Sequence, residues 1–327
     1  IADMLALLAA SHGLSTSTAG QRPAHTVRRA PEARMATLEP GAKVLVTGKG
    51  PVMLLAAKMA AVQGFEVSCL LGTEKSMAEA LIGDTSLPLT LLPVTGDDAD
   101  PAAVEAACTS AAGLIIAFDG EEVLSDAALD IFMPRTGTNF KHVSLMSRHL
   151  NGEGMGFFAK AAKVGANAEI WAGTENVVEG FRTMEKTVRA RAKEVGATST
   201  VIRAGTLKGG GSGDIANGSG DPTFLVGDVF YKLGQQDVVN WRMLFDCDTL
   251  GVVLKKGDVL PGPGFKAAFG ATSPDACDGD SGRGGVANAL VEALRCEGAA
   301  EADFGVGTAK GRASPTPQEW KQLFANA

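Results

Sequence analysis

Short apolar runs alternate with longer amphipathic runs along the chain from about residue 41 onward. The apolar runs, bounded by turn-forming or polar residues, predict strands at 43–47, 66–71, 89–94, 114–118, 142–146 and 198–203. The runs between them predict helices at 51–63, 101–112, 121–132 and 174–195. Because strands separated by crossover helices pair in parallel, we expect an α/β fold with a Rossmann-like, doubly wound parallel sheet.

The pattern is less regular in the last third of the chain. A loop rich in glycine is expected at 209–222, and an aromatic run at 224–245 could form a pocket wall or an interface. Further on, a helix at 285–296, a strand at 303–306 and a closing helix at 317–325 are predicted. We therefore expect one domain over 41–327, in which 206–327 contributes a smaller C-terminal lobe.

The first 40 residues have no strand or long-helix periodicity. They are rich in serine, threonine, alanine and arginine and contain only three acidic residues, Asp3, Glu32 and Glu39. This composition is typical of an organelle transit region or its remnant, which favours the plastid stroma, with the mitochondrial matrix as the alternative. A partner-binding segment or an ordinary flexible extension are the other interpretations of 1–40.

Charge and cysteine usage exclude several classes of function. The 30 basic and 37 acidic residues give a net charge of −7, which disfavours nucleic acid as a partner. No apolar run reaches the roughly 18 residues that a transmembrane helix needs, so only peripheral membrane association through a complex is expected. The five cysteines form no CxxC pair and the histidines no ligand cluster, so neither a disulfide framework nor a metal site is predicted.

A glycine turn lies between the first predicted strand and the first predicted helix. In this position backbone N–H groups and the helix dipole can hold a pyrophosphate. The spacing is Gly-x-Gly-x-x-Met, with Met53 where a third glycine is usual. The sequence predicts dinucleotide contacts from Thr47, Gly48, Lys49, Gly50 and Pro51. The plainer alternative is a tight turn that only packs the helix on the sheet.

The tip of the second strand lacks the acidic residue that binds the ribose hydroxyls of NAD. The run after Leu71 reads Gly-Thr-Glu-Lys, with no arginine for a 2′-phosphate. Lys75 could partly substitute, which gives NADP a slight preference over NAD, whereas the plainer interpretation leaves Glu74 and Lys75 in solvent. The pattern also allows for a protein without a cofactor.

Four further segments carry a family resemblance. They are the turn Gly-Asp-Asp-Ala-Asp-Pro at 96–101, the strand that ends at Ser147, the pair of segments 184–186 and 200–206, and the run 281–294. Together they resemble the atypical short-chain dehydrogenases, the NmrA-like and epimerase-like group, although 206–280 is unmatched. The resemblance implies cofactor contacts from Asp97, Asp98, Phe118 and Ser147, and it makes Ser147 the one catalytic candidate.

The chemistry of that family is largely missing. Its reductases use a tyrosine as general acid and a lysine four residues later that lowers the tyrosine pKa. The only tyrosine here is Tyr231, with Gln235 at the lysine spacing, and the helix expected to carry the pair has Phe181 and Glu185. Tyrosine-dependent hydride transfer is therefore not expected, although some atypical members also lack the tyrosine.

Two functional hypotheses follow from these patterns. The first is a catalytically reduced protein that works as an accessory, assembly or structural subunit of an organellar complex, either photosynthetic or respiratory, with or without bound NADP(H). The second is an active NADPH-dependent oxidoreductase or isomerase that acts on a small molecule. Whether Met53 occupies the space that a pyrophosphate needs should help to separate them.

Overall fold

The structure is a computed structural model that describes residues 37–72, 75–83, 86–119, 124–134, 137–148, 175–205, 207–208, 251–259, 281–309 and 313–327. The chain divides into two units, Ile1–Arg34 and Met35–Ala327, and all described residues belong to the second. The expectations for 1–36, for the loop 209–222 and for the aromatic run 224–245 lie outside the described residues.

Eight strands form one sheet in the order β3-β2-β1-β4-β5-β6-β10-β8. Neighbouring strands pair in parallel except β8, which runs antiparallel to β10. The bounds are β1 Lys43–Lys49, β2 Glu66–Leu71, β3 Leu89–Pro93, β4 Gly113–Phe118, β5 His142–Arg148, β6 Thr198–Ala204, β8 Gly251–Lys256 and β10 Asp303–Ala309. The order 3-2-1-4-5-6 of the first six strands defines a Rossmann-like, doubly wound sheet, as predicted.

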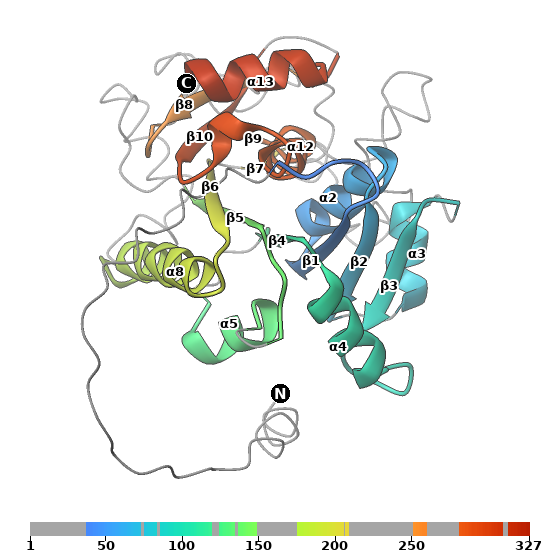
Figure 1. Ribbon diagram of the computed structural model, residues 1–327. Coiled ribbons are helices and arrows are strands. Elements are labelled where there is room, and N and C mark those ends of the chain that lie inside the picture. The colour runs from blue at the N-terminus through green and yellow to red at the C-terminus, as the bar shows by residue number, and fades with distance from the viewer. Residues whose placement is uncertain are drawn as a thin grey trace, which may run out of the picture. The chain divides into compact units, whose positions relative to one another are not determined.

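Helices cover both faces of this sheet (Figure 1). One apolar core joins α2 (Pro51–Val62), α3 (Lys75–Ile82), α12 (Arg283–Ala293) and α13 (Pro317–Asn326) to the sheet. The other joins α4 (Pro101–Ser110), α5 (Asp126–Phe132) and α8 (Glu175–Glu194) to it. The strands alternate between the cores, because successive side chains point to opposite faces. In β1, Val44 and Val46 belong to the first core and Leu45 to the second.

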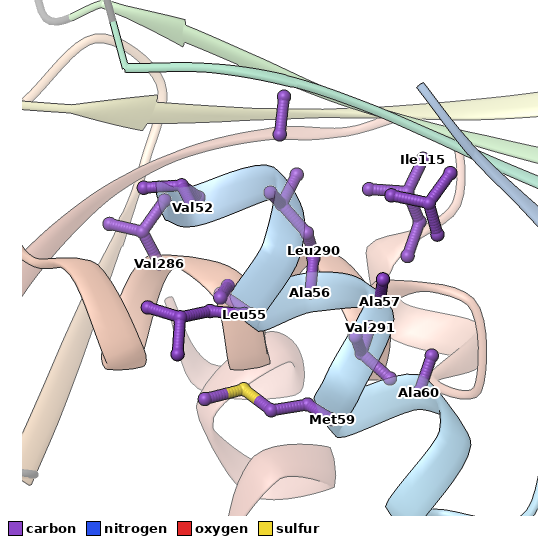
Figure 2. Packing of buried hydrophobic residues seen from close by; sticks show 14 of the residues in the cluster. Val52, Leu55, Ala56, Ala57, Met59, Ala60, Ile115, Val286, Leu290 and Val291 are labelled. Atoms are coloured by element: carbon purple, nitrogen blue, oxygen red, sulfur yellow. The ribbon is translucent and has the colours of Figure 1, made fainter. Parts of the chain in front are cut away.

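The pair α2 and α12 forms the centre of the first core (Figure 2). In Figure 2 side chains of α2 and α12 pack against one another, and Val52 points toward Val286. On α2, Leu55, Ala56 and Ala60 are fully buried, so small side chains allow the helix to lie close to the sheet and to α12. This packing brings the first turns of two helices together near the carboxyl ends of the strands.

The C-terminal third completes the sheet. β10 is a seventh parallel strand beside β6, and β8 forms the edge beyond it. A small second sheet pairs β7 (Leu207–Lys208) with β9 (Ser281–Gly282), which leads directly into α12. The described parts of 206–327 thus pack on the main domain. Most of 206–280 lies outside the described residues, so a distinct smaller lobe stays a prediction.

Several element bounds differ from the sequence predictions. The helix predicted at 121–132 begins at Asp126, because Ser125 caps it and accepts a hydrogen bond from the N–H of Ala128. The helix predicted at 285–296 spans Arg283–Ala293 and is followed by the short 3-10 helix η2 (Glu297–Ala299). The helix α3 and the edge strand β8 were not predicted, although β8 contains the apolar residues Val252, Val253 and Leu254. In the part of the chain that is described, no helix has the length and apolar character to cross a bilayer.

Candidate functional site

The glycine turn lies at the point where the strand order reverses, between the carboxyl ends of β1 and β4. Gly48 has a φ of 133°, and a Cβ on it would lie 1.8 Å from the carbonyl oxygen of Ala117 in β4. Gly50 is the N-cap of α2 with a φ of 98°, and a Cβ there would lie 2.8 Å from the Cβ of Asp119. Both glycines are therefore required by backbone conformation and by close approach.

Two residues that were predicted to contact a cofactor, Thr47 and Phe118, have side chains that contact other parts of the protein instead. Thr47 is fully buried, and its hydroxyl donates to the carbonyl oxygen of Phe132 at 3.1 Å, which ties α5 to β1. Phe118 is buried in the second core, where its ring meets the ring of Phe132 edge to face at 5.2 Å. These contacts hold both side chains inside the protein and do not turn them toward a cofactor.

Met53, which replaces the third glycine, is 4% exposed and belongs to the first core. Its side chain packs with the aliphatic residues of that core, so the hypothesis that Met53 itself fills the pyrophosphate space finds no support in its packing. Pro51, the first residue of α2, has no N–H to offer a phosphate. Lys49 is exposed at the end of β1.

The residue that does lie across the first turn of α2 is Asp119, directly after β4. Its carboxylate oxygen Oδ1 accepts the N–H of Val52 at 2.6 Å. Its own N–H donates to the carbonyl oxygen of Lys49 at 3.2 Å, which continues the pairing of β1 and β4 beyond their ends. Asp119 thus closes the turn from the side of the neighbouring strand.

Two buried arginines hold Asp119 in place. Nε of Arg283, the first residue of α12, lies 2.7 Å from the second carboxylate oxygen, Oδ2, and the two side chains are 10% and 15% exposed. Nη2 of Arg148, at the end of β5, donates to the carbonyl oxygen of Asp119, and its Nη1 donates to that of Gly205 at 3.2 Å. Segments far apart in sequence therefore converge on one aspartate.

The predicted adenine side of the site is open and polar. Lys75 begins α3 and pairs with Glu79 one turn later at 3.9 Å, with both side chains 47% exposed. Asp97 and Asp98 are exposed in the turn after β3. These residues are accessible, but the structure does not bring them together with Ser147, which is on β5, three strands beyond β2 in the sheet order.

Ser147 belongs to a buried network. The side chain is 1% exposed, and its hydroxyl donates to Oε1 of Glu185 on α8 at 2.6 Å. The same carboxylate pairs with Arg203 of β6 through Nε at 3.0 Å and Nη2 at 2.8 Å. The guanidinium also pairs with Asp303 of β10, which is bonded to Arg189 at 3.2 Å. The network joins one helix to three adjacent strands.

Burial opposes the charge of Arg203, but the hydrogen bonds and charges of Glu185 and Asp303 outweigh this effect and raise its pKa. The guanidinium is therefore permanently charged, and Glu185 is its partner. Glu185 accepts the hydrogen bond of the Ser147 hydroxyl while it is paired with Arg203, so this contact fixes the orientation of the serine hydroxyl inside the protein.

The helix position predicted to hold the family's tyrosine is an apolar one. Phe181 on α8 is 3% exposed and belongs to the second core. Glu185, four residues later, stands where a cationic lysine would be needed, and it carries the opposite charge. Tyr231 lies outside the described residues. In the described part of the chain, therefore, no tyrosine and lysine pair stands beside Ser147.

The described cysteines provide no reactive thiolate. Burial raises the pKa of Cys69 to about 12 and, with the charge of Glu105, that of Cys108 to about 11. Burial and the charge of Glu292 raise the pKa of Cys296 to about 12. Within the described ranges, no group of three or more histidine, cysteine or acidic side chains is placed to hold a metal ion.

A dinucleotide does not fit the site in this conformation. The pyrophosphate would have to take N–H groups of the first turn of α2, but Pro51 has none and the N–H of Val52 is used by Asp119. The carboxylate would also repel the phosphates. We therefore derive no catalytic step through NAD or NADP.

Sequence reasoning missed Asp119 and Arg283. The available signal was a charged residue directly after the wholly apolar strand Gly113–Phe118, at the place where parallel sheets bind their ligands. Arg283 lies in the run 281–294 that carries the family resemblance, but its contact with Asp119 follows from the packing of α12 on α2. On α8, Arg182 pairs with Asp258 at 3.0 Å.

The chain was compared with known families, curated proteins and solved structures. No family model and no curated protein matches it. Among solved structures, a protein described as an NAD-dependent epimerase/dehydratase from Bacillus halodurans aligns with 11% identity and a TM-score of 0.45, over 86% of this chain and 100% of that one. An epimerase-like protein from Bacteroides thetaiotaomicron aligns with 12% identity and a TM-score of 0.46, over 84% and 100%.

The yeast methylglyoxal/isovaleraldehyde reductase, in complex with NADPH, aligns with 10% identity and a TM-score of 0.44, over 81% of this chain and 75% of that one. These three neighbours are described as an epimerase/dehydratase, an epimerase and a reductase. Their similarity is too low to carry an argument about function. The strand order establishes the class of fold independently: this chain is a Rossmann-like α/β domain with a doubly wound sheet.

Proposed function

We propose that the protein is a catalytically reduced member of the short-chain dehydrogenase type that acts as an accessory, assembly or structural subunit of an organellar complex. The observation that carries the loss of catalysis is the network around Glu185. This residue takes the position of the catalytic lysine, pairs with Arg203, and accepts a hydrogen bond from the Ser147 hydroxyl. With Phe181 in the position of the tyrosine, hydride transfer has no proton donor there.

The subunit role and the organelle rest on sequence composition. The acid-poor segment 1–40 favours the plastid stroma, with a photosynthetic complex as the partner, and the mitochondrial matrix with a respiratory complex is the alternative. A domain that keeps a full Rossmann-like core while its site residues are used for internal contacts is suited to a structural role. Protein partners are therefore proposed in place of a small-molecule substrate.

The competing proposal is an NADPH-dependent oxidoreductase or isomerase. The observation that favours it is the glycine turn, which keeps positive φ angles at Gly48 and Gly50 between β1 and α2. Ser147 would then orient a substrate. In this proposal Asp119 would have to leave the first turn of α2 when the cofactor binds.

Turnover and complex formation together test the proposed function. Purified full-length protein is mixed with NADPH and a panel of aldehydes and ketones, and absorbance at the reduced nicotinamide band is followed; we expect no oxidation above the rate without protein. Tagged protein expressed in plastids or mitochondria is expected to migrate in a large native complex. NADPH oxidation that Ser147→Ala abolishes, by a protein that migrates alone, would contradict the proposal.

A further inference from the structure

The first turn of α2 lacks the donors of a typical phosphate-binding helix. Its N-cap is Gly50, which has no side chain, and Pro51 has no N–H. The next N–H, that of Val52, lies 2.6 Å from Oδ1 of Asp119. A carboxylate from the neighbouring strand therefore provides the capping contact that Gly50 cannot make.

The second oxygen of the same carboxylate has its own cationic partner. Arg283 is the first residue of α12, and a cation is disfavoured in the first turn of a helix because the dipole is positive there. Its Nε lies 2.7 Å from Oδ2 of Asp119, and Arg283 is 8% exposed. The negative charge of the carboxylate thus compensates both the positive charge of Arg283 and the positive end of the helix dipole.

A phosphate at this point would use the same two donors. Helix N-terminal N–H groups and an arginine side chain are the usual partners of a phosphate group, and both are directed here at Asp119. The aspartate is also fixed by its backbone, because its N–H bonds Lys49 and its carbonyl oxygen accepts from Arg148. Two carboxylate oxygens therefore lie where the oxygens of a phosphate would be bound.

We propose that Asp119 is an internal anion that replaces the cofactor phosphate at the glycine turn, with Arg283 as its counter-ion. It excludes dinucleotides and other phosphate-bearing ligands from the first turn of α2. The inference deepens the proposed function, on which it rests, because it states how the nucleotide site was closed. It also predicts that the site is latent: without the carboxylate, the N–H of Val52 loses its acceptor and can donate to a phosphate beside Arg283.

The test is the affinity of full-length Asp119→Ala for NADPH, compared with the unmodified protein by isothermal titration calorimetry. Since charge-assisted hydrogen bonds are each worth a few kcal/mol, we expect Asp119→Ala to bind at least about tenfold more tightly. Inorganic pyrophosphate serves as a second probe, and it should also bind Asp119→Ala more tightly than the unmodified protein. Glu66→Gln, which also removes one negative charge but on the exposed start of β2, is the matched control and should bind like the unmodified protein.

A second variant tests the counter-ion. Asp119→Ala combined with Arg283→Gln should lose most of the gained affinity, because the phosphate would lack its cation. If Asp119→Ala does not fold, as judged by circular dichroism, Asp119→Asn replaces it, since the amide oxygen can still accept the N–H of Val52 without a charge. Equal NADPH affinity of the unmodified protein and the folded variant, or no binding by either, would overturn the inference. Turnover of a carbonyl substrate bears separately on the proposed function.

Discussion

At the scale of single residues, the site is controlled by polar side chains whose partners are inside the protein. Asp119 caps α2, Ser147 donates to Glu185, and Thr47 donates to a backbone carbonyl of α5. Each of these residue types can contact a cofactor or a substrate, and two of them were predicted to do so. Their burial and their short contacts instead make them part of the core, where an unpaired polar group would be costly.

His142 provides a residue-scale prediction. Its ring is 2% exposed and bonds the hydroxyl groups of Thr198 at 2.6 Å and Thr200 at 2.9 Å. Burial lowers its pKa from 6.5 to about 4, so below pH 6.5 the unfolded chain binds a proton that the folded chain does not. The free energy of unfolding should therefore fall from pH 6.5 to about 4, by up to about 3 kcal/mol.

The measurement is urea unfolding at a series of pH values. His142→Gln should be less stable at pH 7, because the buried hydrogen bonds change, but the difference between variant and unmodified protein should shrink as the pH falls to 4. A constant difference across this window would show that His142 does not titrate with a depressed pKa.

At the scale of elements, buried ion pairs add to the apolar packing that holds α8 in the domain. Glu185 of α8 reaches Arg203 of β6, and Arg191 of α8 reaches Asp130 of α5 at 2.9 Å. On the other face, α2 and α12 rely on interdigitated aliphatic side chains (Figure 2). On its own face of the sheet, α8 also buries Phe181, Met184 and Val188 in the second core, so its ion pairs act in addition to apolar packing.

Arg203→Met tests this connection. The substitution would leave the carboxylate of Glu185, whose side chain is 7% exposed, without its cation, and breaking such a buried pair costs about 3–5 kcal/mol. Chemical unfolding should show this loss in the free energy of unfolding. The double variant Arg203→Met with Glu185→Leu should recover part of it, because no buried charge is left on that side of the pair.

The control is the exposed pair Lys75–Glu79, in which both side chains are 47% exposed. Lys75→Met should change the free energy of unfolding by less than about 1 kcal/mol. If Arg203→Met costs no more than Lys75→Met, the network around Glu185 does not hold α8 on the sheet.

At the scale of the whole molecule, the boundary between the N-terminal segment and the domain has a testable position. The second unit begins at Met35, and Leu38 already belongs to the first core with 4% exposure. Its N–H donates to the carbonyl oxygen of Leu294 at 2.8 Å, and its Cδ1 would lie 2.6 Å from a Cβ on Gly113. Leu38 therefore contributes to the core of the domain, and a truncation after residue 34 keeps it.

Two truncations test this boundary and the partner-binding hypothesis together. Removal of residues 1–34 should leave the melting temperature unchanged, whereas removal of 1–40 should destabilise the domain by about 3 kcal/mol, because the buried leucine is lost. If the segment binds a partner, the shorter truncation should release the folded protein from its native complex. Retention in the complex would contradict a partner-binding role for residues 1–34.

The sequence determined the class of fold and the loss of the catalytic pair. Apolar runs such as 43–47 and 114–118 specify buried strands through local composition, and the absence of a tyrosine at position 181 needs no structure to be recognised. Glycines at 48 and 50 likewise marked the turn, because only this residue type permits its backbone.

Tertiary structure alone decided how the site is used. The partners of Asp119 lie at Val52 and Arg283, and those of Ser147 and Arg203 at Glu185 and Asp303, so each contact depends on how α8, α12 and the strands pack. Such contacts join residues between 18 and 164 positions apart in the chain, and no local pattern specifies them. Hydrogen bonds and ion pairs are short-range and directional, and therefore only the packed fold determines which carboxylate takes the place of a phosphate.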